Sequence, residues 1–195
     1  MDLFLSLCIG IGLSAACGFR VFVPLLVMSI ATKAGHLTLV PAFQWIGSDI
    51  ALWTFAAATC LEVAAYFIPW LDHALDVVAT PVAIVAGIIV TASMVGGMSP
   101  FLKWTLAVIA GGGAAGLVQG ATVVARGAST ATTGGIGNPI FAAIEFGGSV
   151  LTSVLAIIAP VVAIVFLAVI LFYVAKKFAP KFFRKNQSHP NKIET

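Results

Sequence analysis

Long apolar segments, each of a length that suits a membrane-crossing helix, dominate this chain. They lie near 3–31, 49–69, 77–97, 104–126 and 151–175, and a helix needs roughly 20 apolar residues to cross the hydrocarbon core of a bilayer. Apolar residues make up 61% of the 195 residues and charged residues 9%, a composition that soluble domains do not have. The sequence therefore predicts an all-α, polytopic membrane protein with five or six membrane-embedded helices.

The segment 128–150 interrupts this pattern with the stretch "STATTGGIGNPIFAAIEF". Its glycines and its proline break an ordinary helix, and backbone opened at membrane depth must be buried in protein or line a watery cavity. We expect a broken or re-entrant helix here. The alternative is that the Ser and Thr hydroxyls bond their own backbone and the glycines serve close packing.

Two charged residues lie well inside apolar segments. Arg20 is followed by Pro24, which leaves the Arg20 carbonyl without its helical partner; Arg20 either faces inward to a partner or extends to the headgroups. Glu62 lies in the middle of its segment, where an acid needs a partner, a proton or a cavity. The alternative for Glu62 is an ion pair, with Arg20 for example, that only fixes helix packing.

Polar residues recur at helical spacing on both sides of the glycines in 128–150. One stripe precedes them and the other runs from Glu145 through Ser149 to Thr152 and Ser153. We expect these stripes to border a cavity near the middle of the membrane. The residues predicted to line a solute or ion route are Arg20, Glu62, Gln119, Thr122, Arg126, Thr133, Asn138, Glu145 and Ser149.

The turn "DHALD" places Asp72, His73 and Asp76 close together. These side chains are a weak candidate for a metal site, and the alternative is a solvated turn whose acids favour the start of the next helix. The sequence contains no G-x-S-x-G, P-loop, H-E-x-x-H or strand-borne G-x-G-x-x-G motif. We expect no enzyme activity and no cofactor, with a lipid-modifying enzyme built on the "DHALD" turn as a third possibility.

Small residues recur four apart on two segments, as Gly10, Ser14 and Gly18 and as Gly112, Gly116 and Gly120. Such ladders allow helices to approach closely and are natural faces for a homodimer. Each half of the chain also holds one Arg and one Glu inside its apolar segments. We therefore expect a weak internal inverted repeat.

The basic tail after residue 175 predicts the orientation. It carries Lys176, Lys177, Lys181, Arg184, Lys185 and Lys192, so the C-terminus is expected in the cytoplasm. The segment 3–31 is expected to be a full span rather than a signal peptide, because Asp2 precedes it. With five full crossings, this places Lys33 and Lys103 inside and "DHALD" outside, whereas a sixth full crossing would put "DHALD" inside and the two lysines outside. The expected domains are a helical membrane domain, 1–175, and a tail, 176–195, that lies on an anionic leaflet rather than on nucleic acid.

The stretches "AACGFRVFVPLLV", "LEVAAYFIPWLDHALDVVATPVAIVAG" and "STATTGGIGNPIFAAIE" together resemble a group of small bacterial inner-membrane proteins catalogued only as a domain of unknown function. The resemblance covers about 10–170, and the Gly-Asn-Pro stretch followed by Glu145 is its most specific element. It implies a multi-pass protein of the bacterial inner membrane, and it offers no assigned catalytic residues to carry over. From the buried charges we predict a transporter or channel for an ion or small polar solute. The alternative is a structural or regulatory membrane protein in which the same charges are packing pairs.

Overall fold

The computed structural model describes residues 2–65, 69–134 and 137–185. The side chains at 69–77, 138, 174, 175 and 177–185 lie outside that description. Every element within the described residues is a helix, which confirms the all-α class. In chain order the helices are α1 (Leu3–Cys17), α2 (Phe22–Lys33), the 3₁₀ helix η1 (Pro41–Gly47), α3 (Asp49–Ala64), α4 (Pro69–Met94), α5 (Pro100–Leu106), the π-helical η3 (Ala107–Gly112), α6 (Gly113–Thr133), α7 (Asn138–Ile158) and α8 (Pro160–Lys185).

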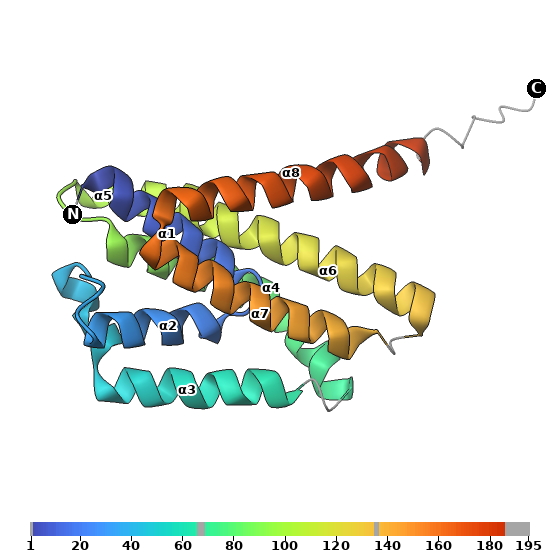
Figure 1. Cartoon of the computed structure of the whole chain (residues 1–195), viewed down its shortest axis with the longest axis horizontal. Helices are drawn as coiled ribbons and strands as arrows, with labels where there is room; N and C mark the ends of the chain where they lie inside the picture. The colour runs from blue at the N-terminus through green and yellow to red at the C-terminus, as the bar shows by residue number, and fades with distance from the viewer. Residues whose placement is uncertain (1, 66–68, 135–136, 186–195) are drawn as a thin grey trace, which may run out of the picture.

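Helices α1 and α2 form a hairpin. The chain reverses after α1, and α2 returns toward the end of the molecule at which α1 began (Figure 1). Contacts with α4 support this reversal, because residues of α1 and residues that follow α2 both meet the last turns of α4. A Cβ on Gly10 would lie 3.2 Å from Thr91 Cα, and Val40, beyond α2, donates its N–H to the Ser93 carbonyl at 3.0 Å. The prediction of one span over 3–31 is therefore wrong. Both arms are apolar, so hydropathy alone does not reveal the reversal.

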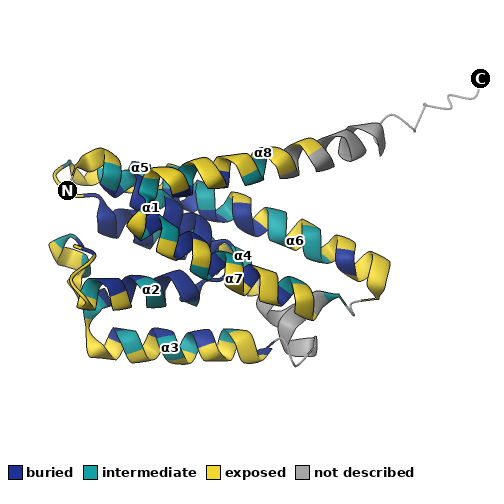
Figure 2. Ribbon diagram, viewed as in Figure 1, coloured by how far each residue is buried: buried dark blue, intermediate teal, exposed yellow. Residues whose placement is uncertain are grey.

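The other helices run along the length of the molecule in alternating directions (Figure 1). Helix α3 is antiparallel to α2, because Lys33 at the end of α2 pairs with Asp49 at the start of α3, while Glu62 near the end of α3 accepts the Phe22 N–H at the start of α2. Helix α1 lies in the centre, packed against α4, α6, α7 and α8. Figure 2 shows it buried along most of its length. The hairpin is thus enclosed by the longer helices on several sides.

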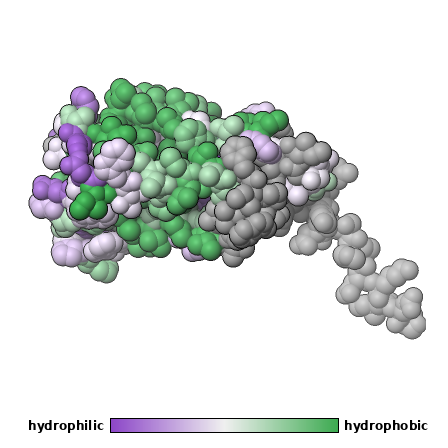
Figure 3. All heavy atoms as spheres, turned by 90° about the horizontal axis from the view of Figure 1, so that it is seen from below, coloured by the Kyte–Doolittle hydropathy of each residue, from purple (hydrophilic) through white to green (hydrophobic). Residues whose placement is uncertain are grey.

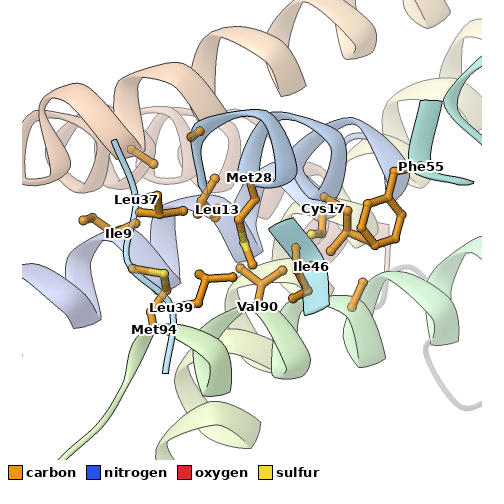
Figure 4. Close-up of a cluster of buried hydrophobic side chains, with 14 of the residues drawn as sticks. Ile9, Leu13, Cys17, Met28, Leu37, Leu39, Ile46, Phe55, Val90 and Met94 are labelled. Atoms are coloured by element: carbon orange, nitrogen blue, oxygen red, sulfur yellow. The ribbon is translucent and has the colours of Figure 1, made fainter. Parts of the chain in front are cut away.

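The hydrophobic core lies along one side of α1. Residues of α1, α2, α3, α4 and η1 meet there, and the labelled members in Figure 4 are Ile9, Leu13, Cys17, Met28, Leu37, Leu39, Ile46, Phe55, Val90 and Met94. On another side of α1, Ala15 packs with Val118 of α6 and Leu167 of α8. Because core side chains touch α1 from different directions, the packing holds the hairpin in one position.

Residues 128–150 do not form one broken segment. Helix α6 continues through Thr133, and Gly134 ends it with a left-handed φ of 63°, a backbone state that favours glycine. Helix α7 begins soon after, at Asn138. Figure 1 shows this turn at one end of the molecule, the end at which α3 finishes and α4 begins. The expected break near the middle of the helices is therefore not at these glycines; such a break is found at the hairpin tip, residues 18–21.

The surface of the helices is largely apolar. Figure 3 shows apolar side chains over the middle of one face and polar ones gathered at one end. Within the described residues, Pro100–Thr133 and Pro139–Ile158 are each long and apolar enough to cross a membrane, and η1 with α3, bent by 61°, would make a third span. Shorter apolar helices cover Leu3–Cys17, Phe22–Lys33, Val78–Met94 and Pro160–Tyr173. These apolar helices indicate a membrane protein.

The hairpin also corrects the expected distribution of charge between the two ends. Lys33 ends α2, and Lys103 of α5 lies nearby, with its ammonium 5.0 Å from the centre of the Phe43 ring in η1. Helix α2 ends, and α5 lies, at the end of the molecule opposite to the one toward which α8 runs (Figure 1). This arrangement does not fit the placement expected from five full spans, in which Lys33 and Lys103 share a side with the basic tail, and it fits the alternative in which the lysines and 72–76 exchange sides. A hairpin returns the chain to the side from which it came, whereas a span does not.

The first glycine ladder is buried inside a single chain. The Ser14 hydroxyl donates to the Gly87 carbonyl at 2.6 Å and shares a hydrogen bond of 2.8 Å with Thr91. Gly10 and Gly18 are buried as well, so this ladder joins helices of one chain and offers no face to a second copy. In the other ladder, Gly112 and Gly116 face α4 and Gly120 is open. A homodimer itself stays a prediction.

The two halves of the chain have different architectures. The first begins with the α1–α2 hairpin, whereas the corresponding part of the second is a continuous helical run, Pro100–Thr133. Pro81 lies inside α4, but Pro160 begins α8. The expected inverted repeat is therefore not seen in the described residues.

Candidate functional site

The tip of the hairpin lies about halfway along α7. Ser149 of α7 donates its hydroxyl to the Ala16 carbonyl at 3.0 Å, and the Arg20 carbonyl lies 3.5 Å from the same oxygen. With a rise of about 1.5 Å per residue, Ser149 stands about 16 Å along a helix about 31 Å long. The hydrocarbon core of a bilayer is about 30 Å thick. If α7 crosses a membrane, the tip therefore lies near its midplane.

The local sequence explains the turn at the tip. Gly18 lies so close to α6 that a Cβ there would be 2.5 Å from the Ala115 carbonyl oxygen, so only glycine fits without a shift. Pro24 stands in the first turn of α2, where its missing N–H leaves no helical bond unmade. The Arg20 carbonyl, which the sequence predicts to lack its helical partner, instead lies near the Ser149 hydroxyl. Here the prediction from Pro24 is confirmed.

Arg20 faces inward. The residue is 2% exposed, and its Nη2 lies 3.1 Å from Glu145 Oε2 and donates to the Ala142 carbonyl at 3.1 Å. The alternative in which Arg20 extends to the headgroups is therefore wrong. Its partner is Glu145 of α7 rather than Glu62, the partner that the sequence suggests as an example.

Arg126 of α6 binds the same carboxylate with two nitrogens. Its Nε donates to Glu145 Oε1 at 2.8 Å, and its Nη2 pairs with Oε2. Glu145 is 4% exposed, and the Arg126 side chain is 13% exposed. Two-nitrogen contacts between Arg and a carboxylate fix both distance and orientation. Glu145 thus joins α6, α7 and the hairpin tip through Arg126 and Arg20.

The side-chain carboxylate of Glu62 binds backbone N–H groups at the start of α2. Its Oε1 accepts the Val21 N–H at 3.0 Å and its Oε2 accepts the Phe22 N–H at 3.2 Å. The first N–H groups of a helix have no partner within the helix and carry partial positive charge. A carboxylate satisfies both requirements, so Glu62 holds α3 against the tip. Arg20 and Glu145 also lie within electrostatic range of Glu62.

The four charged side chains Arg20, Glu62, Arg126 and Glu145 therefore meet around the tip, and we call them the tip cluster. With all four ionised their charges cancel, because there are two cations and two anions. Loss of charge on one carboxylate would leave a net positive site beside the amide N–H groups of α2. Such a site would attract anions.

Several residues predicted to line a route are satisfied locally instead. Thr122 donates to the Gln119 carbonyl at 2.9 Å, and Thr133 donates to the Ser129 carbonyl at 2.8 Å. The Thr133 hydroxyl also accepts the Gly137 N–H at 3.2 Å, which stabilises the α6–α7 turn. Gln119 is buried beside the hairpin. For Thr122 and Thr133, the alternative of bonding to their own backbone is the one observed.

Other predicted positions lie outside the described side chains. Asn138 begins α7 and Asp72, His73 and Asp76 lie in the first turns of α4, but their side chains are not described. Among the described residues, no group of three or more His, Cys, Asp or Glu side chains comes close enough to hold a metal ion. The metal prediction for the "DHALD" turn therefore remains a prediction.

Some features of the site escape sequence reasoning. The Ala142 carbonyl and the amides of Val21 and Phe22 are backbone partners of the tip cluster, and no residue type marks them. The hydroxyls of Ser29 and Thr59 are buried and have no hydrogen-bond partner among the described residues. The one usable signal is the run "GFRVFVP", in which Gly18 and Pro24 enclose Arg20 and mark a turn.

Comparison with known proteins gives a family but no characterised relative. No curated protein and no solved structure matches the chain. The model of a family described as "Domain of unknown function (DUF4126)" matches residues 7–178, which include both arms of the hairpin and all of the tip cluster. Because this match covers nearly all of the helical part, the chain belongs to the DUF4126 family of proteins of unknown function.

Proposed function

We propose that this protein is a membrane transporter or channel for an ion or small polar solute. One observation carries the proposal: the hairpin brings its tip, with Arg20, inside the bundle about halfway along α7, among Glu62, Arg126 and Glu145. Irregular backbone at membrane depth occurs where it is buried in protein or lines a water-filled cavity. Ionisable residues at that depth are costly and often mark solute pathways or proton relays.

The proposed membrane placement has five crossings and one re-entrant hairpin. Helices α3, α4, α5–α6, α7 and α8 cross, and α1–α2 enters and leaves on the side of the N-terminus. The tail carries six Lys and Arg residues, which favours a cytoplasmic C-terminus in a bacterial inner membrane. Lys33 and Lys103 then face the other side, and their smaller number agrees with that orientation.

The tip cluster suggests how a solute would be handled. The guanidiniums of Arg20 and Arg126 are fixed cations that would attract an anionic group. The carboxylates of Glu62 and Glu145 would bind a cation, and Glu62 would also exchange protons. No step requires a covalent intermediate or a cofactor, so the proposal is of a non-enzymatic protein.

Flux into proteoliposomes tests the proposal. Wild type, Glu62→Gln and Glu145→Gln would be reconstituted at equal amounts and assayed with a panel of inorganic ions, protons and small organic acids. Asp2→Asn is the matched control, because Asp2 is an exposed carboxylate that precedes α1, at the end of that helix away from the tip. We expect flux of at least one solute in wild type and in the control, and at least a tenfold loss in both glutamine variants. Equal flux in all four proteins would remove the glutamates from any transport route.

A structural or regulatory protein is the second candidate, and the closed geometry of the cluster favours it. Both oxygens of Glu145 are bonded to Arg126, as expected of a pair that fixes packing. Exchange of the two charges in Arg126→Glu with Glu145→Arg separates the candidates. A packing pair should keep the folded state in the exchanged protein, whereas a solute contact should lose flux although the protein still folds.

A further inference from the structure

Two hydroxyls in the α2–α3 interface differ from the other hydroxyls on the same helices. Thr32 of α2 donates to the Met28 carbonyl at 2.8 Å, and Thr54 of α3 donates to the Ile50 carbonyl at 2.7 Å. This bond to the preceding turn is the usual solution for a helical Ser or Thr. Ser29 and Thr59, by contrast, are buried, and neither hydroxyl has a partner within the described residues.

The helix register places both hydroxyls between the two ends of the interface. Lys33 pairs with Asp49 at the exposed end, and Glu62 reaches the amide of Phe22 at the tip. Ser29 precedes Lys33 by four residues, which places the two on one face of α2. Thr59 precedes Glu62 by three, so these also share a face, and that face of α3 continues through the buried Phe55.

The order of polar groups along the interface is therefore Lys33 with Asp49, then Ser29, then Thr59, then Glu62. Each of these polar groups lies about 5–8 Å from the next along the helix axes, because an α-helix rises about 1.5 Å per residue. One or two water molecules bridge such a gap. Buried polar groups that lack a protein partner usually bond to water, and each such water needs two or more polar partners.

The position of α3 suits such a route. Helix α3 lies at the edge of the bundle and packs on α2 and η1 (Figure 1). Its polar contacts at the two ends are the Lys33–Asp49 pair, which is largely exposed, and the bonds of Glu62 to the tip. Between these ends, a small separation of α3 from α2 would disturb few other elements.

We propose that the α2–α3 interface admits water, and with it protons, from the exposed end at Lys33 and Asp49 to Glu62, by way of Ser29 and Thr59. Water held at these hydroxyls satisfies them and links the surface to the carboxylate at the tip. This inference rests on the proposed function, because it supplies the access route from one side of the membrane to the tip cluster.

Cysteine accessibility tests the route. Ser29→Cys and Thr59→Cys would be made in a protein without Cys8, Cys17 and Cys60, reconstituted, and treated with a small, positively charged methanethiosulfonate reagent. Met28→Cys is the matched control, because Met28 neighbours Ser29, is 0% exposed and packs in the hydrophobic core. We expect both interface cysteines to react at least tenfold faster than the control. Equal, slow reaction at all three positions would overturn the proposal.

A second measurement needs no substitution. Hydroxyl-radical footprinting of the wild-type protein in proteoliposomes oxidises side chains that contact water. Corrected for intrinsic reactivity, oxidation of Phe55 should exceed that of Leu13, which is 0% exposed; equal protection of the two would overturn the route. Solute flux without labelling or oxidation here would reject the route and leave the proposed function standing. Labelling without flux of any solute would reject the proposed function and leave the water route in place.

Discussion

Substitution of Gly18 by alanine is the most direct test of the hairpin. The new Cβ would lie 2.5 Å from the Ala115 oxygen, 2.7 Å from Val118 Cβ and 2.9 Å from the Gln119 nitrogen. Two of these atoms are backbone of α6 and cannot rotate away, so either the tip or α6 must move by about half an ångström or more to reach a normal contact. The backbone of Gly18 is ordinary, with φ −71°, so strain in the main chain adds nothing.

The expected cost is that of overpacking a close helix contact, about 1–3 kcal/mol. For a chain of this length, about 1 kcal/mol lowers the melting temperature by roughly 2–4 °C, so Gly18→Ala should lower it by about 2–12 °C. Thermal unfolding of the detergent-purified protein, followed by tryptophan fluorescence, measures this shift.

Gly120→Ala is the matched control for that measurement. Gly120 lies in α6, where an added Cβ meets nothing within 4 Å, and alanine has the higher helix propensity. Its melting temperature should stay the same or rise slightly. If Gly18→Ala melts at the same temperature as Gly120→Ala, the tip does not lie against α6 as described, and the case for a hairpin at mid-depth fails.

Other predictions concern the polar contacts around the tip. Glu145→Gln should destabilise the protein by about 3–5 kcal/mol, because it removes a charge that is buried with Arg126; addition of Arg126→Gln should recover part of this loss in the same thermal assay. Ser149→Ala should cost about 0.5–1.5 kcal/mol, since its bond to the hairpin is neutral and buried, and no change in urea or thermal unfolding would argue against that contact. Asp49→Asn should cost less than about 1 kcal/mol, because the pair with Lys33 is largely exposed, and 1 M salt should abolish even this difference.

The sequence by itself determined the class of the protein and singled out the four charged residues that meet around the tip. Charged residues are few and are costly inside apolar segments. The sequence alone therefore makes candidate site residues of Arg20, Glu62, Arg126 and Glu145. The glycines and the proline of 128–150 likewise indicate an interruption, although the structure shows it to be the turn between α6 and α7 rather than a break within one segment. These features follow from local rules: the cost of charge in lipid and the backbone preferences of glycine and proline.

Only the tertiary structure decided how those residues are arranged. Hydropathy reports whether a segment is apolar but not its direction, so a hairpin over 3–33 and a single span over 3–31 have the same profile. The partner of Arg20 is Glu145, which lies far away in the chain, and Glu62 binds backbone amides that no residue type identifies. Which carboxylate meets which cation depends on contacts between distant helices, above all on the close approach of Gly18 to α6. Local sequence patterns do not predict such contacts, because the contacts form only when the helices pack around α1.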